Sequence, residues 1–212
     1  MDAIYLLTYD QPHRKTQDLV FRLGVEGIRP TLIVLPWEER ENFIPLYETK
    51  LKAIKDVWPG ALGLHLANIK DVPPGAVVLV GGAPILPADF VNARIVINAH
   101  CGWLPKRRGL DALKWAIYHN ARIGVTVHQV DEDCDRGFLI QREEIPTYPM
   151  DSLFSIAVRQ YEREIDMLVE VAVHKDWLLG LPFEEPAGTV TRRMPHATEI
   201  VMMKRLEYRL SM

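Results

Sequence analysis

The sequence predicts an α/β protein in which a mostly parallel sheet lies between two layers of helices, a three-layer αβα sandwich. Short apolar runs of strand length alternate along the 212 residues with segments of helical spacing. Several runs are apolar at every position, which is typical of parallel strands that helices cover on both faces. Hydrophobic residues make up 48 % of the chain and charged residues 25 %, a mixture that excludes a fibre or a disordered chain.

The N-terminal half reads as strands separated by helices and loops. Apolar, partly β-branched runs predict buried strands over residues 3–8, 31–35, 63–66, 76–80 and 94–97. After the first run, Thr16 is the predicted N-cap of a helix whose apolar stripe ends at Gly24 and Gly27.

The C-terminal half continues with a predicted helix over residues 110–119 and a strand over residues 124–130. After Pro149, apolar residues recur every three or four positions up to Ala172, which predicts a long amphipathic helix packed on the sheet. We divide the chain into a main domain, residues 1–180, and a C-terminal extension, residues 181–212. The extension ends in another predicted helix, which docks either on the domain or on a second copy of the chain.

Composition narrows the class of protein. Lys and Arg total 25 against 28 Asp and Glu, a net charge of −3 that argues against nucleic acid as a partner. The two cysteines, Cys101 and Cys134, fit a reducing compartment. Apolar runs are far shorter than the ~20 residues of a membrane span, and the first residues lack the pattern of a signal peptide. We therefore expect a cytoplasmic protein with no membrane partner.

Four polar side chains lie at or beyond predicted strand ends. Ligands bind outside the carboxyl ends of parallel strands, which directs attention to the residues after the fifth strand and in the later one. Asn98 and His100 alternate, so both point to one face of the extended chain; His128 closes the later strand and Asp135 lies in the turn after it. An amide and an imidazole can hold a developing oxyanion, and a carboxylate can hold the imidazole in its charged form. The alternative is that these are structural hydrogen-bonders in solvated turns.

Two ordered segments resemble the 10-formyltetrahydrofolate-dependent formyltransferases. Residues 98–109, Asn-Ala-His-Cys-Gly-Trp-Leu-Pro-Lys-Arg-Arg-Gly, resemble that family's Asn-x-His-Pro-Ser-x-Leu-Pro-x-x-x-Gly segment. Residues 124–137 resemble its Gly-x-(Ser/Thr)-x-His segment and the following Asp-containing loop. The resemblance covers about a third of the chain and implies a Rossmann-like formyltransferase fold, with residues 1–180 as the catalytic domain.

The resemblance implies a role for each matched residue. Asn98, His100 and Asp135 match the family's catalytic asparagine, histidine and aspartate, and His128 matches a supporting histidine. An acceptor amine attacks the formyl carbon of 10-formyltetrahydrofolate, the co-substrate, and no metal is expected. The pterin-binding loop matches Gly82, Ala83, Pro84, Ile85 and Leu86; the opposite wall of the folate pocket matches Val130, Asp131, Glu132 and Asp133.

The family's Pro-Ser after the histidine is here Cys101-Gly102, which leaves the function of that serine open. A Cys101/His100 nucleophile is disfavoured because adjacent residues in a strand point to opposite faces. A metal site from His100, His128, Cys134 and Asp135 is disfavoured because the spacing matches no known ligand pattern.

The acceptor is predicted to be an amino sugar. Tyr9, His13, Arg14 and Lys15 precede a helix N-terminus, where an anionic acceptor would bind; the alternative is a solvated loop. The chain lacks the Gly- and Ser-rich phosphate loop of the glycinamide ribonucleotide enzymes. It also has no room for the C-terminal barrel of the methionyl-tRNA enzymes. What remains resembles the small sugar N-formyltransferases, which act on nucleotide-linked amino sugars, with a homodimer possible.

Three alternatives stay open at this stage. A glycinamide-ribonucleotide-type enzyme would use a different amine, and a formyltetrahydrofolate hydrolase would use water. A non-catalytic module would bind folate or a nucleotide without turnover. Arg192 and Arg193 either contact phosphate or face water, and Trp37, Trp103 and Tyr118 either stack on a ligand or pack in the core.

Overall fold

A computed structural model describes residues 3–37, 43–174 and 180–212. The helices are α1 (Arg14–Val25), α2 (Ala88–Asn92), α3 (Ala112–Tyr118), α4 (Leu153–Val173) and α5 (His196–Ser211), with 3₁₀ turns η1 (Pro59–Leu62) and η2 (Ile69–Asp71). The strands are β1 (Ile4–Tyr9), β2 (Thr31–Leu35), β3 (Leu66–Ala67), β4 (Val77–Val80), β5 (Ile95–His100), β6 (Arg108–Gly109), β7 (Gly124–Gln129), β8 (Phe138–Glu144), β9 (Leu181–Pro182) and β10 (Val190–Thr191). No helix within the described residues has both the length and the apolar character needed to span a bilayer.

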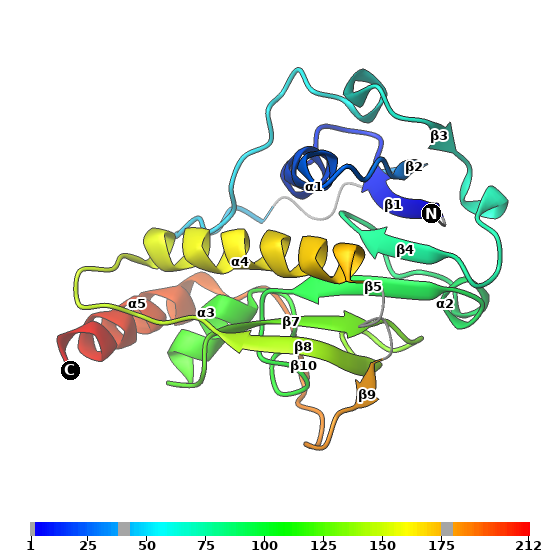
Figure 1. Cartoon of the computed structure of the whole chain (residues 1–212). Coiled ribbons are helices and arrows are strands. Elements are labelled where there is room, and N and C mark those ends of the chain that lie inside the picture. The colour runs from blue at the N-terminus through cyan, green and yellow to red at the C-terminus, as the bar shows by residue number, and fades with distance from the viewer. Residues whose placement is uncertain (1–2, 38–42, 175–179) are drawn as a thin grey trace.

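Within the described residues, eight strands form one sheet in the order β3-β2-β1-β4-β5-β7-β8-β9 (Figure 1). From β3 to β5 all pairings are parallel, which confirms the predicted parallel sheet for that half. From β5 onward the pairings are antiparallel. The helix predicted between β5 and β7 does exist, as α3, yet β7 runs back alongside β5 instead of parallel to it.

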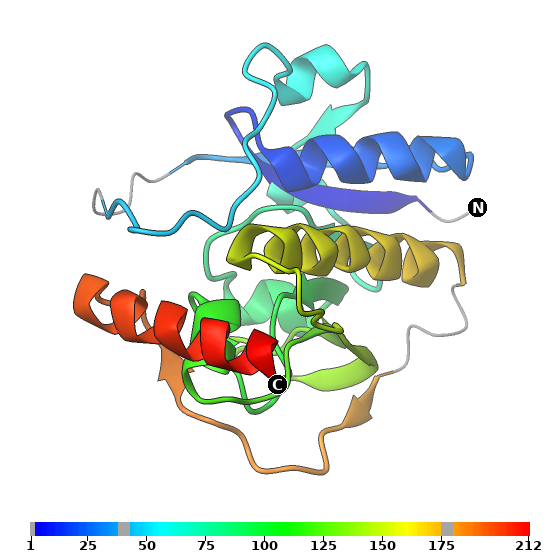
Figure 2. The ribbon, with the colours of Figure 1, turned by 90° about the vertical axis from the view of Figure 1, so that its left-hand side faces the viewer.

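Helices cover the two faces of the sheet unequally. On one face α1 and α4 run side by side and bury Leu19, Leu23 and Leu168 against β1, β4 and β5 (Figure 2). On the other face the short helix α2 packs Phe90 and Val91 onto the sheet. The three-layer α/β arrangement is therefore confirmed, with one thick and one thin helical layer.

The long helix and the C-terminal helix match their predicted patterns. The N-cap of α4 is Ser152, whose hydroxyl accepts a hydrogen bond from the Ser155 amide in a reciprocal capping box. α5 packs on α3 and buries Met202 and Leu206 in the main core. The described part of the extension thus docks on its own domain, while docking on a second copy stays a prediction.

Three local predictions are corrected. Thr16 is not the N-cap of α1, because the helix begins at Arg14 after His13, and the Thr16 hydroxyl is buried 2.7 Å from the Thr8 hydroxyl. The strand predicted over residues 63–66 is β3 at residues 66–67, since Gly63 terminates η1 with a φ of +65°. Asn98 and His100 lie inside β5 instead of after it.

Candidate active site

The antiparallel pairing of β5 with β7 brings the first two polar side chains together. Asn98 lies directly opposite His128 in the register, and the Asn98 Nδ2 atom is 3.4 Å from His128 Nε2. His128 Nδ1 lies 2.6 Å from the Arg136 carbonyl oxygen and so must carry the proton that it donates there. Nε2 is then free to accept from the Asn98 amide, which fixes the orientation of that amide.

Burial keeps the His128 imidazole neutral. The side chain is only 1 % exposed. Desolvation and the positive charges nearby, His100 among them, lower its pKa to about 4 despite the bond to the Arg136 carbonyl. His128 is therefore an uncharged acceptor for Asn98 at neutral pH.

His100 and Asp135 form the second half of the cluster. His100 Nδ1 lies 3.4 Å from Asp135 Oδ1, and Nε2 lies 2.8 Å from the Arg107 carbonyl oxygen. Both ring nitrogens therefore face oxygen acceptors. A protonated imidazole in this position can stabilise negative charge that develops on a nearby oxygen.

The Asp135 carboxylate is held in its ionised form. Desolvation opposes ionisation, but the nearby His100 and the hydrogen bond from the Gly109 amide, 2.7 Å from Oδ2, outweigh it and lower the pKa of Asp135. The residue has a φ of +47°, which turns its side chain out of the loop that follows β7. The loop thus presents a fixed carboxylate to the imidazole.

These side chains line one cavity of about 500 Å³. One wall is the loop after β4, with Ala83, Pro84, Ile85 and Leu86; the other is the loop after β7, with Val130, Asp131, Glu132 and Asp133. Asn98, His100, His128 and Asp135 lie together on it. Gly82 does not line this cavity: its backbone packs against the rings of Tyr9 and His13, where a Cβ would come within 2.8 to 3.0 Å.

The cavity has a third wall, whose residues were not predicted from the sequence. Gly109 and Leu110 line the same cavity together with Val190, Thr191 and Arg192 of the C-terminal extension. The two-residue strands β6 and β10 pair in parallel, and Thr191 Oγ1 bonds the Arg108 and Leu110 carbonyls. The motif glycine at position 109, with a φ of +87°, was the available signal, since a Cβ there would lie 2.2 Å from the Thr191 carbonyl oxygen.

A family model described as formyl transferase matches residues 65–172, which include β5, β7 and every polar side chain of the cluster. The chain belongs to the formyl transferase family.

Relatives of this formyl transferase chain differ in their acceptors. It is 33 % identical over 107 residues to a methionyl-tRNA formyltransferase of Koribacter versatilis, covering 49 % of this chain and 34 % of that protein. It is 34 % identical over 91 residues to a phosphoribosylglycinamide formyltransferase of Haemophilus influenzae, covering 42 % of this chain and 43 % of that protein. The chain therefore matches less than half the length of these relatives.

Solved structures resemble the fold over almost the whole chain. A sugar N-formyltransferase from a Shewanella species aligns with a TM-score of 0.61 at 18 % identity, covering 96 % of this chain and 87 % of that one. An N-formyltransferase from Helicobacter canadensis, solved in complex with folinic acid and dTDP-3-aminofucose, aligns with a TM-score of 0.70 at 12 % identity, covering 98 % and 81 %. At these identities the likeness establishes the shared fold.

The Cys101-Gly102 departure places a thiol on the far side of the strand. Cys101 Sγ lies 2.8 Å from Glu164 Oε2, and burial, followed by the charge of Glu164, raises the pKa of the thiol. A thiol held in this way does not act as a nucleophile with His100, which faces the cavity. No group of three His, Cys, Asp or Glu side chains able to hold a metal occurs in the part of the chain that the structure describes.

The residues predicted to bind the acceptor lie on the α1 side of the site. Lys15 Nζ forms an ion pair with Glu164 at 2.7 Å and bonds the Ala99 carbonyl, and Arg14 pairs with Asp18 at 2.7 Å. His13 packs edge-on against Tyr9, and burial, with the charge of Lys15, lowers its pKa to about 4. Both cations already have carboxylate partners, so an acceptor role for Tyr9, His13, Arg14 and Lys15 stays a prediction.

Proposed function

We propose that this chain is an N-formyltransferase that moves a formyl group from 10-formyltetrahydrofolate to the amine of an amino sugar. The observation that carries the proposal is the meeting of the Asn98 amide, the His100 imidazole and the Asp135 carboxylate on one cavity wall. These groups come from β5 and from the loop after β7, and their order and types match the family's catalytic set.

We assign a step of the proposed reaction to each group. A neutral amine attacks the formyl carbon, and the carbonyl oxygen becomes an oxyanion that the Asn98 amide and the His100 imidazolium stabilise. Asp135 holds the imidazolium and receives the amine proton, directly or through water. As the tetrahedral centre collapses, the bond between the formyl carbon and the folate nitrogen breaks and that nitrogen takes up the proton that Asp135 received. Tetrahydrofolate then leaves, the formamide is the other product and the carboxylate is regenerated. Each well-placed donor contributes ~3 kcal/mol to such a transition state.

The folate donor fits the two loops that form the opposing walls. Ala83, Pro84, Ile85 and Leu86 offer an apolar surface for the pterin ring, and the backbone of residues 130–133 offers hydrogen-bonding groups across from it. The Helicobacter canadensis structure with folinic acid supports this choice of donor. No metal is needed for the chemistry proposed.

An amino sugar attached to a nucleoside diphosphate is the acceptor favoured by the structural likenesses. The fold aligns with sugar N-formyltransferases over most of both chains, and two of those structures contain nucleotide sugars or nucleotides together with folates. The sequence relatives act on methionyl-tRNA or on a glycinamide ribonucleotide, and these remain the competing acceptors. We also propose that the protein is cytoplasmic and forms a homodimer, which cell fractionation and light scattering would test.

An acceptor panel tests the proposal. Purified protein is mixed with 10-formyltetrahydrofolate and nucleotide-linked amino sugars, glycinamide ribonucleotide or no acceptor, and release of tetrahydrofolate is followed. We expect turnover with an amino sugar, at least ~10²-fold lower in Asn98→Ala and unchanged in the matched control Asn92→Ala, which replaces an exposed asparagine of α2. Formate release without an amine would instead identify a hydrolase. Folate binding without transfer to any amine would identify a binding module.

A further inference from the structure

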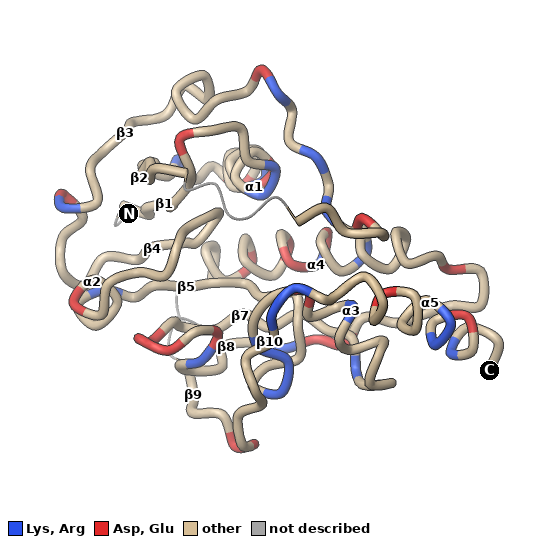
Figure 3. Tube along the Cα trace, turned by 180° about the vertical axis from the view of Figure 1, so that it is seen from behind, with Lys and Arg blue, Asp and Glu red and all other residues tan. Residues whose placement is uncertain are grey.

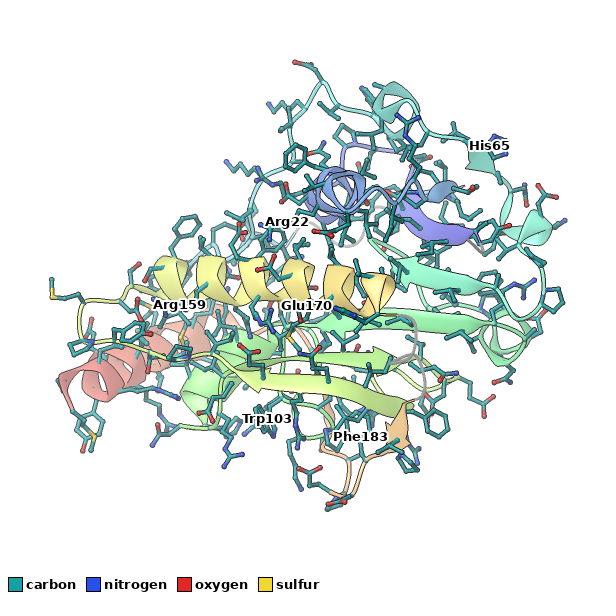
Figure 4. All side chains as sticks on the ribbon, viewed as in Figure 1. Arg22, His65, Trp103, Arg159, Glu170 and Phe183 are labelled. Carbon is teal, nitrogen blue, oxygen red and sulfur yellow. The ribbon has the colours of Figure 1, made fainter. Side chains whose placement is uncertain are left out.

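A second cavity lies on the other side of the β6-β10 ribbon. It measures about 610 Å³, within the ~300–1,000 Å³ usual for small-molecule sites. Thr191 lines both this cavity and the cavity that contains Asn98 and His100. Its floor includes Trp103, which lies on the opposite side of β8 from α4 in the view of Figure 4. Nothing in the proposed reaction has yet used this cavity.

The lining is strongly basic. Lys106, Arg107 and Arg122 line it, and Figure 3 shows Lys and Arg segments of the chain gathered around β10. Among the described lining residues the acidic one is Glu185, which accepts from Arg142 Nη2 at 3.0 Å and also interacts with the charge of Lys106. Arg122 lies over the Trp103 ring, 5.0 Å from its centre, and has a loose, exposed contact with Glu144 at 3.7 Å. Three cations against one carboxylate leave the described lining of the cavity with a net positive charge.

Arg107 is the lining residue that most strongly indicates a ligand in this cavity. Its Nε atom is buried without a hydrogen-bond partner, and no ion pair of its guanidinium occurs among the described residues. Partial burial lowers the pKa of this guanidinium. The same charge contributes, after burial, to a lowered pKa of the neighbouring His119. The buried Nε atom lacks a hydrogen bond, which costs free energy, and an oxyanion bound through two parallel hydrogen bonds to this guanidinium removes that cost.

Close backbone contacts hold one wall of this cavity in place. The Gly188 amide bonds the Pro105 carbonyl at 2.8 Å, and a Cβ at Gly188 would lie 2.2 Å from the Lys106 carbonyl oxygen. This close approach fastens the extension to the loop that carries the two cations. The backbone of Arg107 in turn accepts the hydrogen bond of His100, so this wall continues directly into the catalytic cluster.

We infer that this cavity is a binding site for phosphoryl oxyanions, in which Arg107 and Lys106 hold the anion. A planar guanidinium fork beside an ammonium suits phosphate oxygens. The phosphoryl group has two possible sources: the diphosphate of the acceptor, which would make the site part of the proposed function, or a separate phosphate-bearing ligand. The binding claim itself does not depend on formyl transfer.

Calorimetric titration with pyrophosphate, without folate, tests the inference. We expect saturable one-to-one binding to the wild-type protein that weakens at least ~10-fold in Arg107→Gln and several-fold in Lys106→Gln. Arg29→Gln removes the same charge at an exposed position far along the chain and should bind as the wild type does. Arg107→Lys keeps the charge without the fork, and we expect it to fall between wild type and Arg107→Gln. His119 supplies a second readout, because a bound anion should raise the pKa that NMR reports for its ring.

Absence of pyrophosphate binding at millimolar concentration would overturn the inference, as would equal binding by wild type and Arg107→Gln. Pyrophosphate that competes with the acceptor in the transfer assay would identify the acceptor's diphosphate as the natural ligand. Binding without competition would identify a separate phosphate ligand. Because the titration needs no turnover, its result is independent of the acceptor panel.

Discussion

The buried imidazole of His128 makes the stability of the protein depend on pH. Its pKa in the folded protein is about 4, against 6.5 for an ordinary histidine. Between these two values the unfolded chain binds more protons than the folded one, so acidification favours unfolding. The contribution of a neutral His128 is complete above pH 6.5 and disappears as the pH falls toward 4.

The size of the effect follows from the two pKa values. From about pH 7.5 to about pH 5, the free energy of unfolding should fall by roughly 2 kcal/mol on account of this one group. Salt and solvent screen it little, because the side chain is only 1 % exposed. His13, with a pKa of about 4 as well, adds a separate loss of similar sign.

Urea unfolding at the two pH values measures this loss. His128→Gln keeps an acceptor for Asn98 and removes the titrating ring, so we expect its pH dependence to be smaller than that of wild type by roughly 2 kcal/mol. His65→Gln is the matched control, since His65 is exposed at the periphery of the molecule (Figure 4). If His128→Gln and wild type lost equal stability on acidification, His128 would not be a buried neutral group and its role toward Asn98 would be wrong.

Three further substitutions test the site and its support. Gly102→Ala should reduce turnover at least ~10-fold, because its Cβ would lie 2.6 Å from the Arg107 carbonyl oxygen and 2.7 Å from Nε2 of the catalytic imidazole. Asp135→Asn should lower kcat by about 10²-fold with folate affinity nearly unchanged, because the amide cannot stabilise an imidazolium. Lys114→Met should destabilise the fold by about 3–5 kcal/mol in urea titrations, since it leaves the Glu199 carboxylate, 0 % exposed, without its cation.

For each of these substitutions, a control variant or a defined outcome tests the explanation. Gly24→Ala adds a methyl group with nothing within 4 Å and should leave turnover unchanged. Equal rates for the Gly102 and Gly24 variants would mean that the loop does not fix the imidazole. A wild-type kcat in Asp135→Asn would remove the carboxylate from the mechanism. Addition of Glu199→Gln to Lys114→Met should restore part of the lost stability; a further loss would contradict the ion-pair explanation.

Periodicity predicted most elements of the fold. The continuous apolar runs of β1, β2 and β4 and the three-to-four spacing of α4 are local signals, and they appear where expected. The direction of β7 was not predictable in this way. A helix between two strands usually indicates a crossover connection and hence parallel strands, but the chain after α3 returns antiparallel to β5. His128 therefore meets Asn98 through direct antiparallel pairing and not through a shared carboxyl edge of the sheet.

Those parts of the site that lie within short sequence motifs were predictable. Asn98 and His100 alternate along one strand, so their common face follows from the sequence alone. The wall contributed by Val190 and Thr191 was not predictable, since a two-residue strand has no period and its partner lies about eighty positions away. Neither Thr191 nor the buried Nε atom of Arg107 carries a local signal of its environment.

A crystal structure with bound 5-formyltetrahydrofolate tests the central claim most directly, because this analogue presents a formyl group and resists transfer. We expect a formyl oxygen within hydrogen-bonding distance of both Asn98 Nδ2 and the His100 ring, with the pterin between residues 83–86 and 130–133. A folate whose formyl group lies away from those two side chains, or that binds outside this cavity, would contradict it.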